Sequence, residues 1–232
     1  MTYQVNEIFD SIQGEGFFTG TPATFIRLQG CTVGCSWCDS GPVADETWGR
    51  FTNGLTRNTW GIGGMRMTLD EILDKVNRTH VVITGGEPTM YNLDSLIDGV
   101  ARRFPDKPVT VQLETSGQNG YKGKLIPDWV TWSPKQNLNF EGAEAIRLTV
   151  DEVKFVVDTN LEWSTVKKIV LEQVELRMTI PWIYLMPEGC PPSDVNIKQC
   201  LSWLKSFKEI NGISIEPRLR FGDRLQYRLG IR

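Results

Sequence analysis

The sequence predicts an α/β fold built on a mainly parallel sheet, either open or curled into a partial barrel. Two observations predict it: apolar, β-branched runs of strand length alternate with stretches of helical period, and short polar turns follow several of these runs. Helices that connect neighbouring strands in this way form right-handed crossovers onto a parallel sheet. With 232 residues and 40% hydrophobic content, the chain can bury a sizeable core, and we expect one domain over residues 1–232.

The first two strands are expected at residues 3–13 and Ala23–Leu28, on either side of the turn Gln13-Gly-Glu-Gly16. Glycines beside an acidic residue allow the backbone to approach a ligand, which the glutamine and the glutamate would hydrogen-bond. A tight turn with solvated side chains is the alternative. Arg27 lies inside the second apolar run, where an unpaired guanidinium group is costly, so we expect it to have an anionic partner.

Residues 41–67 are rich in glycine and show no sustained period, which predicts an irregular insertion. A capping box at Thr68-Leu-Asp-Glu71 then begins a helix, with apolar residues at helical spacing as far as Val76. The run His80-Val-Val-Ile-Thr84 predicts a parallel strand that is buried on both faces. His80 opens this strand, and we interpret it as structural.

The same alternation continues along the chain. Helices are expected at residues 92–104, 162–175 and 193–208, and strands at 109–115, 129–133, 153–157, 182–186 and 213–216. Polar turns follow three of the strands, at Gly85-Gly-Glu-Pro88, Glu114-Thr-Ser-Gly117 and Ser133-Pro-Lys135. Because barrel-like sheets place their chemistry at the C-terminal ends of the strands, we expect these turns to share one functional rim.

The stretch Cys31-Thr-Val-Gly-Cys35-Ser-Trp-Cys38 carries the strongest chemical signal. Its three thiols lie in a loop broken by Gly30 and Gly34, and they could converge on one metal centre. Three cysteines leave one coordination position vacant, whereas four close a zinc site or an electron-transfer cluster. The alternatives are a zinc knuckle completed by a distant residue and three reduced thiols without metal.

The other two cysteines are assigned no ligand role. Cys200 falls on the apolar face of a predicted helix and is interpreted as a core residue, and Cys190 lies in a loop. Five cysteines, with three of them crowded together, fit a metal site in a reducing compartment better than a disulfide framework.

Charge and hydropathy exclude several classes of partner. The net charge is −3, from 25 basic and 28 acidic residues, so no basic field indicates nucleic acid and no polybasic run indicates lipid. No leader pattern opens the sequence, and no apolar segment is long enough to span a bilayer. We expect a cytoplasmic protein with a small-molecule substrate, without direct nucleic-acid or membrane contact.

The cysteine spacing resembles the signature of the radical S-adenosylmethionine (SAM) enzymes, in which three thiolates hold a [4Fe-4S] cluster and SAM chelates the fourth iron. The turn that begins at Gly85 resembles the SAM-amine motif of that family. Further strings resemble the 7-carboxy-7-deazaguanine synthases over most of residues 1–157, namely Val5–Gly16, Phe25–Cys31, Cys38–Ser40, Glu114–Gly117 and Ser133–Lys135.

This resemblance implies a modified partial (β/α) barrel of the radical SAM type, usually assembled as a homodimer. The implied reaction converts 6-carboxy-5,6,7,8-tetrahydropterin to 7-carboxy-7-deazaguanine with release of ammonia, a step toward queuosine and related 7-deazapurines. The implied cofactors are a [4Fe-4S] cluster, SAM and Mg2+, and a flavodoxin- or ferredoxin-type reductant would supply electrons. Another radical SAM enzyme, such as a glycyl-radical activase, and a non-enzymatic zinc-binding module are the alternatives.

Carried over by position, the resemblance implies four groups of site residues. The cluster ligands are Cys31, Cys35 and Cys38. The SAM contacts are Trp37, Cys38, Asp39, Gly85, Gly86, Glu87, Ser116, Ser133, Pro134 and Lys135. The pterin contacts are Ile12, Gln13, Gly14, Glu15, Arg27, Thr84, Glu114, Gln226 and Arg232. Ser40 corresponds to the Mg2+ ligand, and its hydroxyl oxygen is the kind of hard donor that Mg2+ takes.

The C-terminal segment departs from the family, in which many relatives carry a histidine that helps to bind the pterin. Aligned on Leu229 and Ile231, Gln226 falls at the place of that histidine, and Arg232 bears the terminal carboxylate. Glutamine can donate or accept a hydrogen bond but cannot become a cation. The segment either docks and closes the pterin pocket or is a frayed polar tail, and the apolar residues, Leu225 included, favour docking.

Overall fold

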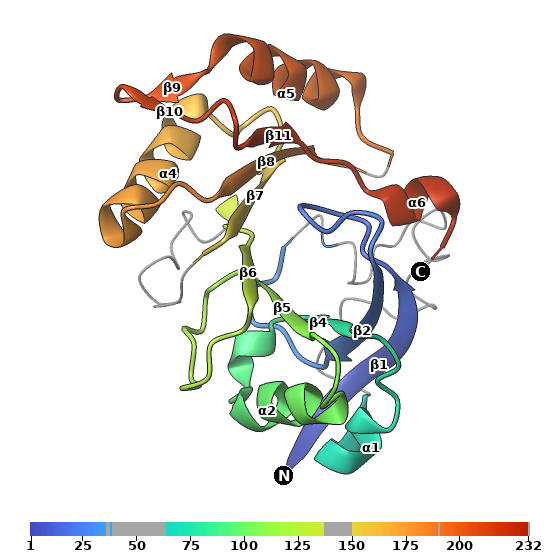
Figure 1. Cartoon of the computed structure of the whole chain (residues 1–232). Coiled ribbons are helices and arrows are strands. Elements are labelled where there is room, and N and C mark those ends of the chain that lie inside the picture. The colour runs from blue at the N-terminus through green and yellow to red at the C-terminus, as the bar shows by residue number, and fades with distance from the viewer. Residues whose placement is uncertain (36–37, 39–63, 137–149, 190, 232) are drawn as a thin grey trace.

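The computed structural model describes residues 1–35, 38, 64–136, 150–189 and 191–231. Within these residues, nine strands form one curved sheet in the order β11-β8-β7-β6-β5-β4-β2-β1-β3 (Figure 1). The strands of this sheet are β1 (Thr2–Ile12), β2 (Pro22–Leu28), β3 (Met65–Thr68), β4 (His80–Gly85), β5 (Thr110–Thr115), β6 (Trp129–Trp132), β7 (Glu152–Val157), β8 (Trp182–Pro187) and β11 (Leu219–Phe221). The helices are α1 (Leu69–Leu73), the 3-10 turn η2 (Pro88–Met90), α2 (Asp94–Arg103), α4 (Trp163–Arg177), α5 (Asp194–Ser206) and α6 (Leu225–Leu229).

The sheet is mainly parallel. Seven strands run parallel to one another, namely β2, β4, β5, β6, β7, β8 and β11. At one edge, β1 pairs antiparallel with both β2 and β3. Figure 1 shows the sheet curving around an interior, with α1 and α2 outside one half and α4 and α5 outside the other. The two edge strands, β3 and β11, do not pair, so the sheet is not closed as a barrel. The predicted α/β class with a mainly parallel, partly barrel-like sheet is confirmed.

Side chains alternate along the strands between an apolar core under the helices and a more polar cavity on the inner face of the sheet. On β7, Val153 and Phe155 are fully buried in the apolar core, while Lys154 between them lines the inner cavity. Successive residues of a strand point to opposite faces, so one strand serves both layers. Helices complete the core from outside, and Cys200 of α5 is fully buried there, which confirms its interpretation as a core residue.

The helix expected after Thr68 is present but short. The hydroxyl of Thr68 accepts from the backbone N–H of Glu71 at 3.3 Å, and the carboxylate of Glu71 accepts from the N–H of Thr68 at 2.7 Å, so the predicted capping box is confirmed. Helix α1 ends at Leu73 rather than near Val76, although Val76 is fully buried. No helix among the described residues is long and apolar enough to cross a lipid bilayer.

Part of the predicted irregular insertion is a strand. Residues Met65–Thr68 form β3, which pairs antiparallel with the start of β1 and places Met67 opposite Tyr3. Both side chains are buried, so their burial stabilises a strand that four residues of mixed polarity do not predict. Residues 41–63 of the insertion lie outside the described part of the chain.

The last predicted strand, 213–216, is shorter than expected and does not join the main sheet. Residues Ile213–Ser214 form β10, which pairs with β9 (Glu209–Ile210) in a separate two-stranded ribbon. Asn211 and Gly212 join them with φ of 48° and 77°, the left-handed backbone of a tight hairpin turn. The asparagine–glycine pair was a legible hairpin signal, whereas β11, with only three residues, was too short to show a period.

Candidate active site

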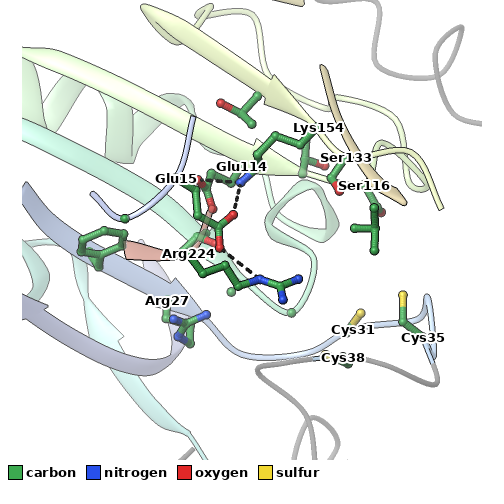
Figure 2. A pocket seen from close by; sticks show the side chains of 18 of the residues that line it. Glu15, Arg27, Cys31, Cys35, Cys38, Glu114, Ser116, Ser133, Lys154 and Arg224 are labelled. Carbon is green, nitrogen blue, oxygen red and sulfur yellow. Dashed lines mark hydrogen bonds and ion pairs between the residues drawn. The ribbon is translucent and has the colours of Figure 1, made fainter. Parts of the chain in front are cut away.

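A cavity of about 300 Å3 lies on the inner face of the curved sheet, where the strands end (Figure 2). It brings together most of the residues that the sequence singled out. Those that line it are Ile12, Gln13, Gly14, Glu15, Arg27, Cys31, Cys35, Cys38, Thr84, Gly85, Gly86, Glu114, Ser116, Ser133, Lys135 and Gln226. Trp37, Asp39, Ser40, Cys190 and Arg232 lie outside the described residues, and Pro134 is described but does not line the cavity.

The cysteine loop forms one wall of the cavity. Cys31, Cys35 and Cys38 all line it as thiols rather than disulfides, and Cys35 is 9% exposed. Burial raises the pKa of the Cys31 thiol, although the N–H of Val33 donates to its sulfur. No group of three or more His, Cys, Asp or Glu side chains in the described chain converges on a single metal ion. Each thiolate of an iron–sulfur cluster binds its own iron, so a cluster does not require such convergence.

Gly86 explains why the glycine turn after β4 stands beside this loop. A Cβ atom added there would lie 2.0 Å from the carbonyl oxygen of Gly30 and 2.7 Å from the Cβ of Cys31. The N–H of the next residue, Glu87, donates to the same Gly30 carbonyl at 2.8 Å. Any larger residue at position 86 would therefore push the cysteine loop away from the sheet.

Glu87 lies beneath the cavity and does not line it. Its Oε1 accepts hydrogen bonds from Thr89 and Thr115, and its Oε2 accepts from the N–H and the hydroxyl of Ser116. The residue is 1% exposed. The carboxylate ties the turn after β4 to the turn after β5 and fixes Gly86 and Ser116 on the rim. The contact between the Glu87 carboxylate and SAM stays a prediction.

The glycines of Gln13–Gly16 make room for other parts of this chain. A Cβ atom at Gly14 would lie 1.6 Å from Oε1 of Gln226, and one at Gly16, where φ is +71°, would lie 2.1 Å from Oε1 of Glu152. The glycines are therefore needed where the C-terminal segment and a buried carboxyl group approach the turn. The contact that we predicted between this backbone and a ligand stays a prediction.

The C-terminal segment is docked. The N–H of Leu225 donates to the carbonyl of Gly14 at 3.0 Å, and Nε2 of Gln226 donates to Oε1 of Glu15 at 3.0 Å. Helix α6 therefore sits over the β1–β2 turn, which confirms docking (Figure 1). Leu229 does not hold it, because this residue is 56% exposed, whereas Leu225 and Ile231 are partly buried.

A buried charge cluster occupies the cavity wall opposite the cysteines (Figure 2). Lys154 contacts Oε2 of Glu15 at 2.9 Å and Oε1 of Glu114 at 3.2 Å, and Arg224 lies 3.6 Å from Oε1 of Glu15. Burial alone would raise the pKa of Glu15, but the charges of Lys154 and Arg224 outweigh it and lower the pKa to about 2. Burial would lower the pKa of Lys154, but Glu114 and Glu15 raise it. Glu15 and Lys154 are therefore both ionised near neutral pH.

Arg27 lies on the neighbouring strand β2 and also lines the cavity. Its Nε bonds Oε1 of Glu7 at 2.9 Å, and its guanidinium carbon lies 6.0 Å from the centre of the Phe9 ring. The prediction that Arg27 has an anionic partner is thus confirmed. With a side chain 20% exposed, Arg27 presents a pre-oriented cation to the cavity.

Several curated proteins are similar to this chain. The 7-carboxy-7-deazaguanine synthase of Bacteroides thetaiotaomicron is 38% identical over 161 residues, which cover 68% of this chain and 72% of that protein. The chain belongs to the 7-carboxy-7-deazaguanine synthase family. The Buchnera aphidicola synthase of this family is 36% identical over 165 residues, covering 68% and 72% of the two chains. The Escherichia coli synthase is 38% identical over 155 residues, and this match spans only 63% of its length.

The fold agrees with this family membership. The crystal structure of QueE from Escherichia coli matches with a TM-score of 0.64 at 27% identity, covering 96% of this chain and 93% of that one. No protein-family model matches the chain. The structural match covers 96% of this chain, whereas the sequence match to the Bacteroides thetaiotaomicron synthase covers 68%. The structural match therefore includes elements that the sequence match does not reach.

Two charged residues of this family member's cavity were missed. Lys154 stands in the otherwise apolar run Val153–Val157, and the argument applied to Arg27, that a charge inside such a strand needs a partner, would have found it. Arg224 offered no comparable signal, because it precedes a short helix in a segment of mixed polarity.

Glu152 is expected to make the stability of the protein depend on pH. Burial, together with Glu114 and Glu15, raises its pKa from 4.5 to about 7, against the opposing effects of Lys154 and the Phe17 N–H. Between pH 4.5 and about 7 this carboxyl group is ionised in the unfolded chain but still protonated in the folded protein. The free energy of unfolding therefore falls as pH rises through this range. The full effect is about 3 kcal/mol.

Glu152→Gln removes this ionisation, and we expect it to increase the free energy of unfolding at pH 8 but not at pH 5. Urea unfolding at the two pH values measures the difference. Glu172→Gln, on the exposed side of α4, is the matched control and should change neither value by more than about 0.5 kcal/mol. Equal effects of Glu152→Gln at both pH values would contradict the raised pKa.

Proposed function

We propose that this protein is a radical SAM enzyme that converts 6-carboxy-5,6,7,8-tetrahydropterin to 7-carboxy-7-deazaguanine with release of ammonia. One observation carries the proposal: a single cavity has the three thiols on one wall and a charged, hydrogen-bonding pocket on the other. Membership of the synthase family supports the same reaction. A cavity of about 300 Å3 suits a small ring substrate better than a protein segment, which disfavours a glycyl-radical activase.

The residues present fit the cofactors that this reaction needs. Cys31, Cys35 and Cys38 would hold a [4Fe-4S] cluster, and the closely packed Gly86 and the Ser133–Lys135 turn would border SAM. When bound there, cluster and SAM supply the one-electron chemistry that starts the ring contraction. Lys135 donates to the hydroxyl of Ser133 at 2.7 Å, so this turn is ordered from within the chain.

The chain's own contribution is to bind and orient the pterin. Arg27 would pair with the substrate carboxylate, and Glu114 would accept from ring N–H groups. Gln13 donates to Glu114 at 3.1 Å and so fixes the direction of that carboxylate. Pre-oriented groups of this kind lower the barrier by placement, because the substrate need not reorganise them during the reaction.

Turnover assays test this proposal. After anaerobic reconstitution with iron and sulfide, we expect SAM, dithionite and the carboxytetrahydropterin to give a product with the mass of 7-carboxy-7-deazaguanine. Product should be absent without the cluster. A protein that contains zinc, binds no iron and forms no product would instead support the zinc-binding module. We also propose that the enzyme forms a homodimer, depends on Mg2+ and receives electrons in the cell from a flavodoxin- or ferredoxin-type donor.

Ser40→Ala tests the proposed Mg2+ ligand, which is motivated by the sequence Cys38-Asp-Ser40. We expect the variant to keep its cluster and its SAM binding but to turn over more slowly and to respond less to added Mg2+, because a hard oxygen ligand is lost. Initial rates across a Mg2+ titration measure this. The same response in variant and wild type would show that Ser40 is not a ligand.

A further inference from the structure

Lys154 stands where two carboxylates face one small cavity. Its side chain is 8% exposed and lies between Oε2 of Glu15, at 2.9 Å, and Oε1 of Glu114, at 3.2 Å. Two ionised carboxylates this close to each other in a buried region repel, and one of them would otherwise take up a proton. The ammonium group of Lys154 removes this conflict by bonding both.

Glu15 and Glu114 differ in how many of their carboxylate oxygens are bonded within the chain. Both oxygens of Glu15 are bonded within the chain: Oε2 by Lys154, and Oε1 by Gln226 at 3.0 Å with Arg224 at 3.6 Å. Glu114 bonds Lys154 and Gln13 through Oε1 alone. Its Oε2 has no hydrogen-bond partner among the described residues, and Glu114 lines the cavity. Glu114 therefore retains one acceptor for a ligand, whereas Glu15 holds the docked C-terminal segment.

We propose that Lys154 is a positioning residue, whose ammonium group bonds both Glu15 and Glu114 and holds Glu114 so that it offers its second oxygen to an N–H edge of the substrate. This inference rests on the proposed function, since it assigns the contact to the pterin ring. Lys154 itself acts through the two carboxylates. The ammonium group thus couples substrate recognition on β5 to the docking of the C-terminal segment through the β1–β2 turn.

Other charged or titratable groups surround this cluster on every neighbouring element. They are Glu152 on β7, Arg224 before α6, His80 on β4, Tyr184 on β8 and Arg220 on β11. Arg224 is the one cation among them within salt-bridge distance of Glu15, and it does not bond Glu114 in the described structure. Removing Lys154 would therefore leave Glu114, with a side chain 21% exposed, beside like charges without its cation, and its proton affinity would rise.

The experiment compares Lys154→Met, Lys154→Arg and wild type over pH 6 to 9. For Lys154→Met we expect KM for the pterin to rise about tenfold, the loss expected when a charge-assisted hydrogen bond is weakened. The ratio of variant to wild-type kcat/KM should fall further, by about tenfold, from pH 9 to pH 6, because Glu114 becomes protonated as pH falls. Lys154→Arg keeps the charge, so its ratio should stay constant with pH. Lys168→Met, with a side chain 78% exposed on α4, is the matched control and should behave as wild type.

A structural role alone would give a different result. Lys154→Met would then lose activity equally at all pH values, and that outcome would overturn the proposal. If Lys154→Met does not fold, Lys154→Gln takes its place, because glutamine is polar and can still hydrogen-bond the carboxylates but carries no charge. Its ratio should fall toward low pH in the same way, and a flat ratio would again overturn the proposal. Cluster content and SAM cleavage without pterin should be unchanged in every variant. An inactive wild type would refute the proposed function instead.

Discussion

Replacing Cys35 by alanine is expected to abolish turnover. Cys35 is 9% exposed on the cavity wall beside Cys31 and Cys38, and the two remaining thiolates cannot hold three irons of a cluster. We expect the variant to lose the broad visible absorption of a four-iron cluster, to cleave no SAM and to form no product. Iron and sulfide analysis, visible spectra and mass spectrometry after anaerobic reconstitution measure these three quantities.

The matched control is Cys200→Ala, which removes a thiol of the same kind from the apolar core. Cys200 is fully buried on α5, so its loss should lower the free energy of unfolding by about 1 kcal/mol through a small cavity. It should keep the cluster and the activity. Product formation by Cys35→Ala at the wild-type rate would contradict a cluster held by these cysteines, and equal losses in both variants would point to a general effect on folding.

The fold was predictable from the sequence where periodicity is strong. Continuous apolar runs such as His80–Thr84 correctly predicted the buried parallel strands, and the Thr68–Glu71 capping box correctly predicted the start of α1. Prediction failed where elements are too short to show a period. Strands β3 and β11 have four and three residues, and their pairing partners decide their conformation.

The site was predictable where a motif reports chemistry directly, as the three cysteines and the polar strand ends do. It was less predictable where the same residue type can serve two roles. Glu87 and Glu15 were predicted to contact ligands, and those roles stay predictions. What the sequence did not predict is which groups of the chain bond them, namely two turns for Glu87, and Lys154, Gln226 and Arg224 for Glu15. Which donors reach a carboxylate depends on long-range packing, since Glu15 and Gln226 are 211 residues apart.

Deleting residues 226–232 is expected to raise KM for the pterin by ten- to a hundredfold, which corresponds to losing a hydrogen bond to a charged group worth about 1.5–3 kcal/mol. The deletion removes the bond from Gln226 to Glu15 and most of α6, which docks on the turn that carries Gln13 and Gly14. The β1–β2 turn would no longer be packed against α6, and the hydrogen bond from Gln13 would hold Glu114 less firmly. Steady-state kinetics with varied pterin measure the effect.

Two further measurements separate a role in substrate binding from a general loss of structure. Cluster content and SAM cleavage without pterin should match wild type, because the described part of the cysteine loop packs on the turn after β4. Leu229→Ala, at a side chain that is 56% exposed, is the control and should leave KM unchanged, whereas Gln226→Ala should reproduce much of the deletion. Because glutamine carries no charge, the loss in Gln226→Ala should be the same from pH 6 to 9. An unchanged KM in the truncated enzyme would mean that the segment docks without contributing to the pterin site, and Gln226 would then serve only to hold Glu15 in place.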